Sequence, residues 1–284
     1  MLRGIITMAL KHSLYGRYAY NLALSIKSAD PTQQVCVIAD DVGLSHLHEG
    51  QRMIFDKIIK PTADCYMRDG KTVPLVCKFY LNELTPYEQT LFVDADMIFS
   101  PLAKFSEFWE QMQGVEWTMA NRGENDPDKG ISEWVNADKL KEAYDDITQW
   151  VDLSSEWICW KKSDLSDSIF VRARQYYDEG KLTTRSFAGD KPDEPFFNLA
   201  LNSVGHQPHA MPYQPTYWQP AVKKFMSAVE IKKQYLAFSV GGRMIPKQQQ
   251  IIYDEFCKNA SYRMNMPTLK VTHKMNSLPE RTVI

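Results

Sequence analysis

Two aspartates interrupt an apolar run near residue 95, and their types and spacing are suited to binding a metal ion. Residues 90–93 predict a buried strand, Asp94-Ala95-Asp96 follows at once, and residues 97–99 predict that the strand resumes. Unpaired buried charge costs several kcal/mol, so the two carboxylates must meet a cation or reach solvent at a cleft. At this spacing both lean toward one side of a strand end, where they could hold Mn²⁺ or Mg²⁺ and a substrate diphosphate.

A second group of acids precedes a predicted helix. Asp190, Asp193 and Glu194 lie in a turn before Phe196-Phe197-Asn198-Leu199, a largely apolar segment. Asp193 is a natural N-cap, and Pro195 suits the first helical turn. The pattern therefore predicts a helix start that carries two adjacent carboxylates.

The opening of the chain predicts the elements that position these acids. Residues 4–9 predict a buried strand, residues 18–28 a helix, and residues 35–39 a second strand that ends at Asp40-Asp41. This β-α-β order predicts an α/β fold with a mostly parallel central sheet flanked by helices. Ligands then lie at the carboxyl ends of the strands. Residues 73–84 predict a further helix, residues 117–121 a strand, and residues 166–179 an amphipathic helix.

Composition excludes several classes of protein. The 284 residues are 44% hydrophobic and 24% charged, which is typical of a folded chain, and no linker divides them. No apolar run is long enough to cross a membrane, and the first strand is too short for a signal peptide, so we expect a cytoplasmic protein. Five cysteines without a C-x-x-C pair favour reduced, buried thiols. The absence of G-x-G-x-x-G and of a P-loop disfavours dinucleotide enzymes and P-loop NTPases.

The C-terminal segment is basic in a chain of net charge −2. Residues 221–284 hold eleven Lys or Arg and four Asp or Glu, and the remainder holds 22 basic and 31 acidic residues. Pairs such as Lys223-Lys224 and Lys232-Lys233 could face an anionic donor or acceptor, although a solvated helix face is the more common role of such clusters. Tyr213, Tyr217 and Trp218 are candidates for a lid or an acceptor site.

The run from Lys78 to Phe99 resembles the corresponding stretch of glycogenin-like glycosyltransferases, which are family 8 and its GT-A-fold relatives. A helix with a lysine leads through a Leu-Thr-x-Tyr turn into a strand that ends in Asp-Ala-Asp. Residues 193–198 are similar to the family's D-Q-x-x-x-N helix start, with Glu194 in place of the usual Gln. Residues 271–275 are similar to its late strand ending in His, but the usual Gly and Lys-Pro-Trp that follow are absent.

The resemblance implies a GT-A-type single domain and a set of roles. Asp94, Asp96 and His273 hold the metal, Asp94 also contacts the donor ribose, and Lys78 lies by the donor diphosphate or sugar. From their position at the ends of the first two strands, Thr7, Ala9 and Asp40 are expected to cradle uracil and ribose. Position and charge alone make Lys274 or Arg281 a candidate to replace the missing diphosphate lysine. Asp193 and Glu194 are the catalytic candidates near the sugar. Residues 1–101 form the nucleotide-sugar half, residues 102–219 the acceptor side, and residues 220–284 complete the metal site.

The function implied is a metal-dependent glycosyltransferase that moves a sugar from a nucleotide-diphosphate sugar, with a UDP-sugar as the favoured donor, to an acceptor hydroxyl. The resemblance implies retention of configuration; in an inverting reaction, Asp193 or Glu194 is instead the candidate base. Three classes of acceptor are compatible with the sequence: a glycan, a protein and a modified nucleic-acid base. One alternative is a sugar-phosphate nucleotidyltransferase. Such enzymes normally need a basic, Gly-rich loop directly after the first strand, and residues 10–16 match that pattern poorly. A non-catalytic nucleotide-sugar or glycan-binding protein is the other, disfavoured because Asp94, Asp96 and His273 are all present.

Overall fold

The computed structural model describes residues 1–121, 134–144, 153–187, 189–205, 215–217, 226–240 and 246–271. The strands are β1 (Arg3–Ala9), β2 (Val35–Ala39), β3 (Lys57–Ile59), β4 (Met67–Arg68), β5 (Lys71–Thr72), β6 (Gln89–Val93), β7 (Met97–Phe99), β8 (Trp117–Asn121), β9 (Leu153–Lys161), β10 (Thr216–Tyr217) and β11 (Ala237–Ser239). The α-helices are α1 (Ser13–Ala29), α2 (Glu49–Arg52), α3 (Leu81–Leu84), α4 (Phe105–Gln111), α5 (Ala137–Ala143), α6 (Asp164–Glu179), α7 (Glu194–Ser203), α8 (Ala228–Gln234) and α9 (Pro246–Met264). Two 3₁₀ helices are η1 (Ala63–Cys65) and η2 (Pro74–Tyr80).

The central sheet has the strand order β3-β2-β1-β6-β9-β8. The pairs β3–β2, β2–β1 and β1–β6 are parallel, whereas β9 runs antiparallel to both β6 and β8. The expected β-α-β opening and the mostly parallel sheet are therefore confirmed. The chain passes from β1 to β2 on one side and reaches β6 on the other, so the carboxyl end of β1 lies where the strand order reverses, the usual position of a ligand crevice.

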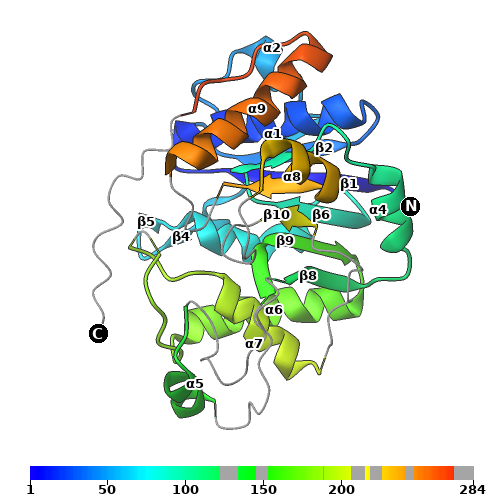
Figure 1. The fold of residues 1–284 in the computed structure, drawn as a ribbon. Coiled ribbons are helices and arrows are strands. Elements are labelled where there is room, and N and C mark those ends of the chain that lie inside the picture. The colour runs from blue at the N-terminus through cyan, green and yellow to red at the C-terminus, as the bar shows by residue number, and fades with distance from the viewer. Residues whose placement is uncertain are drawn as a thin grey trace.

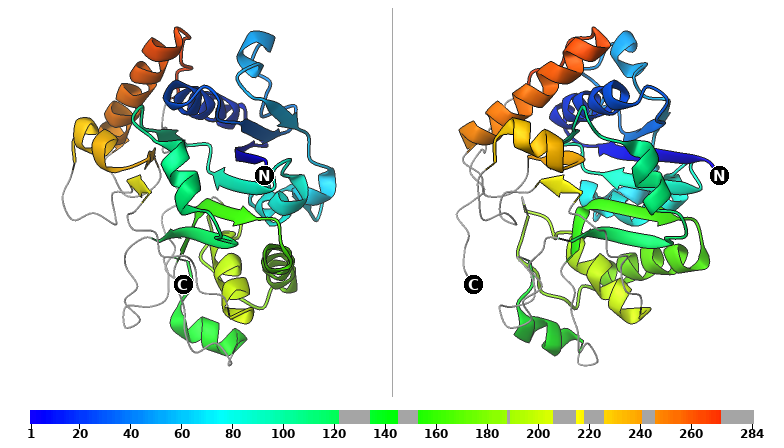
Figure 2. Two further views of the ribbon diagram at one scale, coloured as in Figure 1. Left: turned by 90° about the vertical axis from the view of Figure 1, so that its right-hand side faces the viewer. Right: turned by 45° about the vertical axis from the view of Figure 1, so that its right-hand side comes forward.

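Helices cover both faces of this sheet. Figure 1 shows α1 and α9 on one side and α6 and α7 on the other, and both views in Figure 2 agree. Successive side chains of a strand point to opposite faces of the sheet. In β1, Ile5 packs in the hydrophobic cluster with α1 and α9, and Ile6 packs in the cluster with α6 and α7. The two clusters account for the strongly apolar central strands, because both of their faces are buried.

One local expectation was wrong. The segment expected as one helix over residues 73–84 consists of η2 followed by the short α3. Residues 76–79 are all buried, so no amphipathic helical face exists, and Val, Cys and Phe have modest helix propensity. The strand expected at residues 97–99 is confirmed as β7, which joins a smaller sheet of order β10-β11-β7 and not the central sheet.

The remaining general expectations concern cysteines and the membrane. All five cysteines are buried and unpaired, as expected. None of the helices within the described ranges has the length and hydrophobicity needed to cross a bilayer. The cytoplasmic location and the proposed division of the chain at residues 101 and 219 stay predictions.

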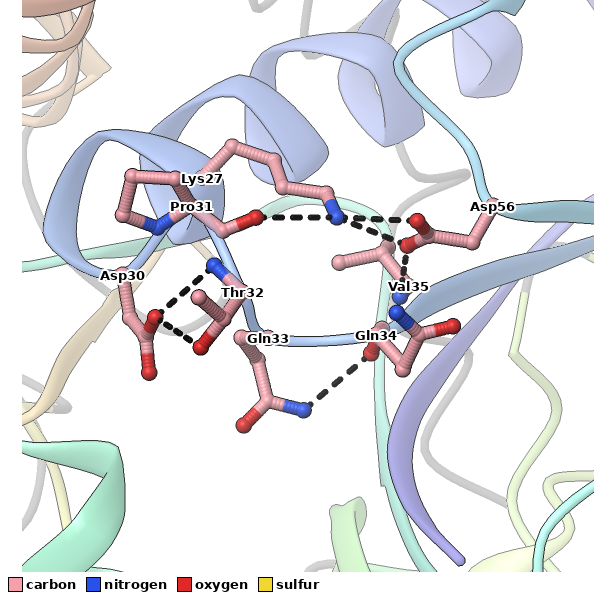
Figure 3. Close-up of polar contacts among 8 residues, drawn as sticks. All are labelled: Lys27, Asp30, Pro31, Thr32, Gln33, Gln34, Val35 and Asp56. Atoms are coloured by element: carbon pink, nitrogen blue, oxygen red, sulfur yellow. Dashed lines mark hydrogen bonds and ion pairs between the residues drawn. The ribbon is translucent and has the colours of Figure 1, made fainter.

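An ion pair far from the predicted site links α1 to the start of β2 through Asp56, a partly exposed residue that directly precedes β3. Lys27 Nζ lies 2.8 and 3.1 Å from the two carboxylate oxygens of Asp56, and Asp56 also accepts a hydrogen bond from Val35 N at 2.7 Å. Figure 3 shows that the lysine comes from the last turn of α1 and that Val35 begins β2. This pair is structural, and it provides a comparison for the buried lysine of the candidate site.

Candidate functional site

The two aspartates of the D-A-D sequence lie where the chain passes from one sheet to the other. β6 is fully buried up to Val93, and a turn closed by the 3.1 Å hydrogen bond from Met97 N to Asp94 O directs the chain into β7. Asp94 and Asp96 are half-buried, whereas Ala95 between them is buried. Both carboxylates therefore stand at the carboxyl end of a central strand, as the sequence predicted.

Lys78 is a buried cation that holds two carboxylates together. Only 2% of the residue is exposed, and its Nζ lies 2.9 Å from Asp94 Oδ1 and 3.3 Å from Asp193 Oδ2. Nζ also donates to the carbonyl and hydroxyl oxygens of Ser155 at 3.3 and 3.4 Å. Burial lowers the pKa of Lys78, but the charges of Asp193 and Asp94 outweigh burial and raise it above its ordinary value. Lys78 is therefore a charged internal counter-ion.

Asp193 stands at the N-cap position of α7, but its side chain does not cap the helix. Its backbone is already helical, with φ −81° and ψ −30°, and no side-chain hydrogen bond reaches the first turn. The expectation of a capping side chain was therefore wrong. The carboxylate pairs with Lys78 instead, because a buried ammonium is a stronger partner than a neutral backbone N–H.

The rest of the α7 start is bound to the beginning of β9. Glu194 is buried and accepts a hydrogen bond from Ser155 N at 3.2 Å. The Asn198 amide accepts from Leu153 N at 3.3 Å and donates to Leu153 O at 3.2 Å. The predicted catalytic pair is thus brought beside the D-A-D sequence, Asp193 through Lys78 and Glu194 through Ser155.

Glu156 is a further acid at this edge, and the sequence analysis did not identify it. It lies in β9 beside Asp94, whose N–H donates to Glu156 O at 3.0 Å, and its carboxylate accepts from Ser239 Oγ at 2.9 Å. The signal in the sequence is a single acid directly before the apolar residues 157–160. Glu156 therefore adds a negative charge from a strand remote in sequence.

These charges and burial alter the titration of the aspartates. Burial raises the pKa of Asp94 to about 6, with Lys78 opposing the shift and Glu156 and Asp193 adding to it. Burial raises the pKa of Asp96 to about 7, and the charges of Asp94 and Glu156 add to the shift. Negative charge at this edge is therefore only partly compensated by Lys78.

The donor set fits a hard divalent cation in part. Asp94 and Asp96 offer carboxylate oxygens, which are the ligands that Mn²⁺ and Mg²⁺ prefer. A bound divalent cation would also relieve the repulsion that helps to raise the pKa values of the two groups. Within the described part of the chain, however, no group of three His, Cys, Asp or Glu residues is arranged to hold a metal ion. His273, the predicted third ligand, and Lys274 lie outside the described residues, as does Arg281.

The residues predicted to cradle the nucleoside lie inside the fold. Thr7 and Ala9 are fully buried. Asp40 accepts hydrogen bonds from Lys11 N at 2.9 Å and from Gly43 N at 2.6 Å. A Cβ on Gly43 would lie 1.8 Å from Ala9 O, so only glycine permits this packing over the strand ends. Asp40 thus shapes the loop at this edge, and direct donor contacts by the three predicted residues stay a prediction.

Tyr15 is an aromatic residue at the same edge that the sequence analysis did not single out. It lies in the first turn of α1 and is 43% exposed. Partial burial and the charges of Asp96 and Asp94 raise the pKa of its phenol. Its phenol is therefore within electrostatic range of the two carboxylates, and the exposed part of its ring could stack against a flat ligand.

Two other sets of predicted residues are the C-terminal lysine pairs and the aromatic candidates for a lid or acceptor site. Those that the structure describes are mostly engaged in contacts within the fold. Lys232 Nζ pairs with Glu255 Oε1 at 3.1 Å and lies 5.4 Å from the ring centre of Phe256, so it is committed to α9, whereas Lys233 is exposed. Tyr217 is fully buried and packs against other aromatic rings. Lys223, Lys224, Tyr213 and Trp218 lie outside the described residues.

Comparison with known proteins places the fold. No family model and no curated protein matches the chain. Among solved structures, the galactosyltransferase LgtC in complex with donor and acceptor sugar analogs is similar, with TM-score 0.58 and 12% identity over 94% of this chain and 97% of LgtC. The apo structure of the bifunctional glycosyltransferase WbbM gives TM-score 0.59 and 12% identity over 93% of this chain. Apo GlyE from Streptococcus pneumoniae TIGR4 gives TM-score 0.58 and 11% identity, also over 93%.

The extent of these matches differs. The chain spans 51% of the WbbM chain and 62% of the GlyE chain, but nearly the whole of LgtC. The resemblance to GT-A glycosyltransferases that the sequence indicated is thereby confirmed at the level of the fold. This chain is a single α/β domain with the GT-A fold of the glycosyltransferases LgtC, WbbM and GlyE.

Proposed function

We propose that this protein is a metal-dependent glycosyltransferase that moves a sugar from a nucleotide-diphosphate sugar, specifically a UDP-sugar, to an acceptor hydroxyl. The observation that carries the proposal is the cluster at the carboxyl end of β6, where Lys78 holds Asp94 and Asp193 beside Asp96. The likeness to glycosyltransferases supports the reaction class, because this cluster lies at the edge where the strand order of their shared fold reverses.

Asp94 and Asp96 would hold Mn²⁺ or Mg²⁺, with His273 as the proposed third ligand. When bound, the ion supplies positive charge that stabilises the departing nucleoside diphosphate. Lys78 pairs with both Asp94 and Asp193 and fixes the two carboxylates relative to each other. Lys274 is proposed to add a cation at the diphosphate.

Asp193 and Glu194 would act at the sugar. Both carboxyl groups are buried and fixed, one by Lys78 and the other by the Ser155 N–H, so they can orient sugar hydroxyls without first losing side-chain freedom. We propose retention of configuration, with this pair beside the reacting carbon. LgtC was solved with an acceptor sugar analog, which favours a glycan hydroxyl as the first acceptor class to test here.

Nucleotide binding tests the proposal directly. Thermal unfolding should be followed with UDP, GDP, CDP and ADP, each with and without Mn²⁺, and the best nucleotide then offered as its sugar derivatives. A Mn²⁺-dependent stabilisation by UDP, with slow release of free sugar from a UDP-sugar, is the expected result. Stabilisation by none of the four would contradict the proposal, and pyrophosphate release from a nucleoside triphosphate would assign a nucleotidyltransferase instead.

A further inference from the structure

Lys11 lies in the loop after β1, at the edge of the sheet where the strand order reverses. β1 pairs in parallel with β6 up to Ile6 and Phe92, so both strands leave the sheet at the same edge. β1 ends at Ala9, two residues before Lys11, and β6 ends directly before Asp94. The loop that carries Lys11 therefore stands beside the loop that carries the carboxylate pair.

The backbone at Lys11 has an unfavourable conformation for a residue with a side chain. Its φ is +69°, and the N–H of His12 donates to Leu10 O at 2.8 Å, which closes a tight turn around Lys11. Turns of this kind with positive φ are rare, and glycine would adopt them at lower cost. The Asp40 carboxylate holds the conformation by accepting from Lys11 N at 2.9 Å. The side-chain direction of Lys11 is thus fixed by a strained turn, a feature that is frequent at functional sites.

The ammonium of Lys11 has weak partners. Nζ donates to Thr72 O at 3.0 Å and lies 3.9 Å from Asp190 Oδ2, and 52% of the side chain is exposed. An exposed pair at this separation contributes little stability. Lys78, in contrast, is buried between two carboxylates and cannot be spared for a ligand. Lys11 can therefore exchange its partners for a phosphate, with which an ammonium forms stronger charge-assisted hydrogen bonds.

The position of Asp190 relates Lys11 to the rest of the site. Asp190 precedes Asp193 by three residues, and Asp193 shares Lys78 with Asp94. The edge is rich in acids, because Asp96 and Glu156 lie there as well. A nucleoside diphosphate is itself an anion, so it would be repelled there unless cations besides the metal faced it.

We propose that Lys11 is a donor-contacting residue whose ammonium leaves Thr72 and Asp190 and binds the diphosphate of the nucleotide sugar. This inference rests on the proposed function and extends it to a residue that the family resemblance did not indicate. Glycine would satisfy the positive φ of this turn at lower cost, so the turn alone does not require a lysine. Binding of the diphosphate would explain why a lysine occupies this position.

The test compares affinities for UDP in the presence of Mn²⁺ by calorimetry. Lys11→Met should weaken UDP binding about 10-fold and leave uridine, followed by ligand-observed NMR, unchanged. Lys11→Arg should retain affinity within about 3-fold because it keeps the charge. Lys60→Met is the matched control: Lys60 pairs with Asp41 at 2.5 Å, both side chains are exposed, and the same charge is removed, yet UDP affinity should not change.

Lys11→Gly distinguishes the effect of losing the ammonium from the effect of changing the strained turn. Glycine relieves the strain at positive φ, so this variant should melt above Lys11→Met, yet it should bind UDP as weakly. Wild-type affinity in Lys11→Met or in Lys11→Gly would overturn the role of Lys11 while leaving the proposed function intact. Failure of the wild type to bind any of the four nucleoside diphosphates would instead overturn the proposed function, and this inference with it.

Discussion

Lys78 Nζ lies 3.3 Å from Oδ2 of Asp193, although Asp193 occupies the N-cap position of α7. The same ammonium lies 2.9 Å from Asp94 Oδ1, at the end of β6. One buried cation therefore fixes the distance between the strand that carries the proposed metal ligands and the helix that carries the proposed sugar-binding acids. This arrangement makes Lys78 a positioning residue for both.

Lys78→Met should impair both folding and donor use. The change leaves two partly or fully buried carboxylates without their cation, which should lower the free energy of unfolding by about 3–5 kcal/mol. The donor KM should rise, because the carboxylates of Asp94 and Asp193 are no longer fixed relative to each other. Chemical denaturation and initial rates at varied UDP-sugar concentration measure the two effects.

Lys27→Met is the matched control for this variant. Lys27 is also a buried lysine paired with a carboxylate, Asp56, but the pair joins α1 to β2 away from the site (Figure 3). The control should lose stability and keep its donor KM. Equal changes of donor KM in both variants would show that general destabilisation, and not the Lys78 contacts, affects donor binding.

The pKa values of Asp94 and Asp96 predict how pH affects the metal-free protein. They are raised to about 6 and about 7, so the folded state retains protons that the unfolded chain loses at lower pH. The unfolding temperature in EDTA should therefore fall as pH rises from about 5 to about 7, and level off above. Mn²⁺ competes with these protons, so its affinity should rise over the same range. A pH-independent Mn²⁺ affinity would contradict this assignment.

Asp96→Asn should separate stability from activity. The neutral amide removes a charge that burial and Asp94 disfavour, so the metal-free variant should melt above the wild type at pH 8, with a difference that shrinks below about pH 7. Mn²⁺-dependent turnover should fall at least about 100-fold. Asp41→Asn, at an exposed carboxylate after β2, should change neither property. Undiminished turnover in Asp96→Asn would remove the D-A-D sequence from the mechanism.

The elements that carry the site were predictable where the apolar pattern is local. The strand before Asp94 and the β-α-β opening each lie in a short run of buried residues, and parallel pairing then places their carboxyl ends at one edge. The partners of Lys78 were not predictable in this way. They come from β6, β9 and α7, which are remote in sequence, and the N-cap pattern at Asp193 indicated a different use of its carboxylate.

Glu156 and Lys11 are two further residues that could not be assigned to the site from their local sequence. Glu156 is one acid beside an apolar strand, and only its pairing opposite Asp94 brings it to the site. Lys11 precedes a helix in a polar turn, where a lysine is ordinarily a solvated residue, and only its backbone conformation and contacts set it apart. Long-range contacts and strain are not encoded in a local pattern.

Glu156→Gln should shift the titration of the aspartates. Removing this charge lowers the pKa values of Asp94 and Asp96, so the pH range over which Mn²⁺ affinity rises should move to lower pH. Above about pH 8, Mn²⁺ should bind a few-fold more weakly, because the site has lost one negative charge. Glutamine can still accept the hydrogen bond from Ser239 Oγ, so the local structure should persist. An unchanged pH midpoint in a Mn²⁺ titration would show that Glu156 does not act on the pair.

Asn21→Leu should release the segment that leads to His273. Asn21 is fully buried in α1; its Nδ2 donates to Leu269 O at 2.8 Å and to Tyr253 Oη at 3.1 Å, and its Oδ1 accepts from Leu269 N at 2.8 Å. Loss of these bonds should cost about 1–3 kcal/mol and increase proteolytic cleavage within residues 265–271.

The same variant should weaken Mn²⁺ binding if His273 is a ligand, because that residue follows Val271 by two positions and depends on a fixed approach. Asn82→Leu is the control: Asn82 is a buried asparagine that accepts from Trp160 Nε1 at 2.6 Å, and Trp160 packs in the cluster on the other face of the sheet. The control should lose stability without losing Mn²⁺ affinity. A similar loss of affinity in both variants would mean that Asn21 affects the metal only through overall stability, whereas a loss confined to Asn21→Leu ties the metal site to the C-terminal segment.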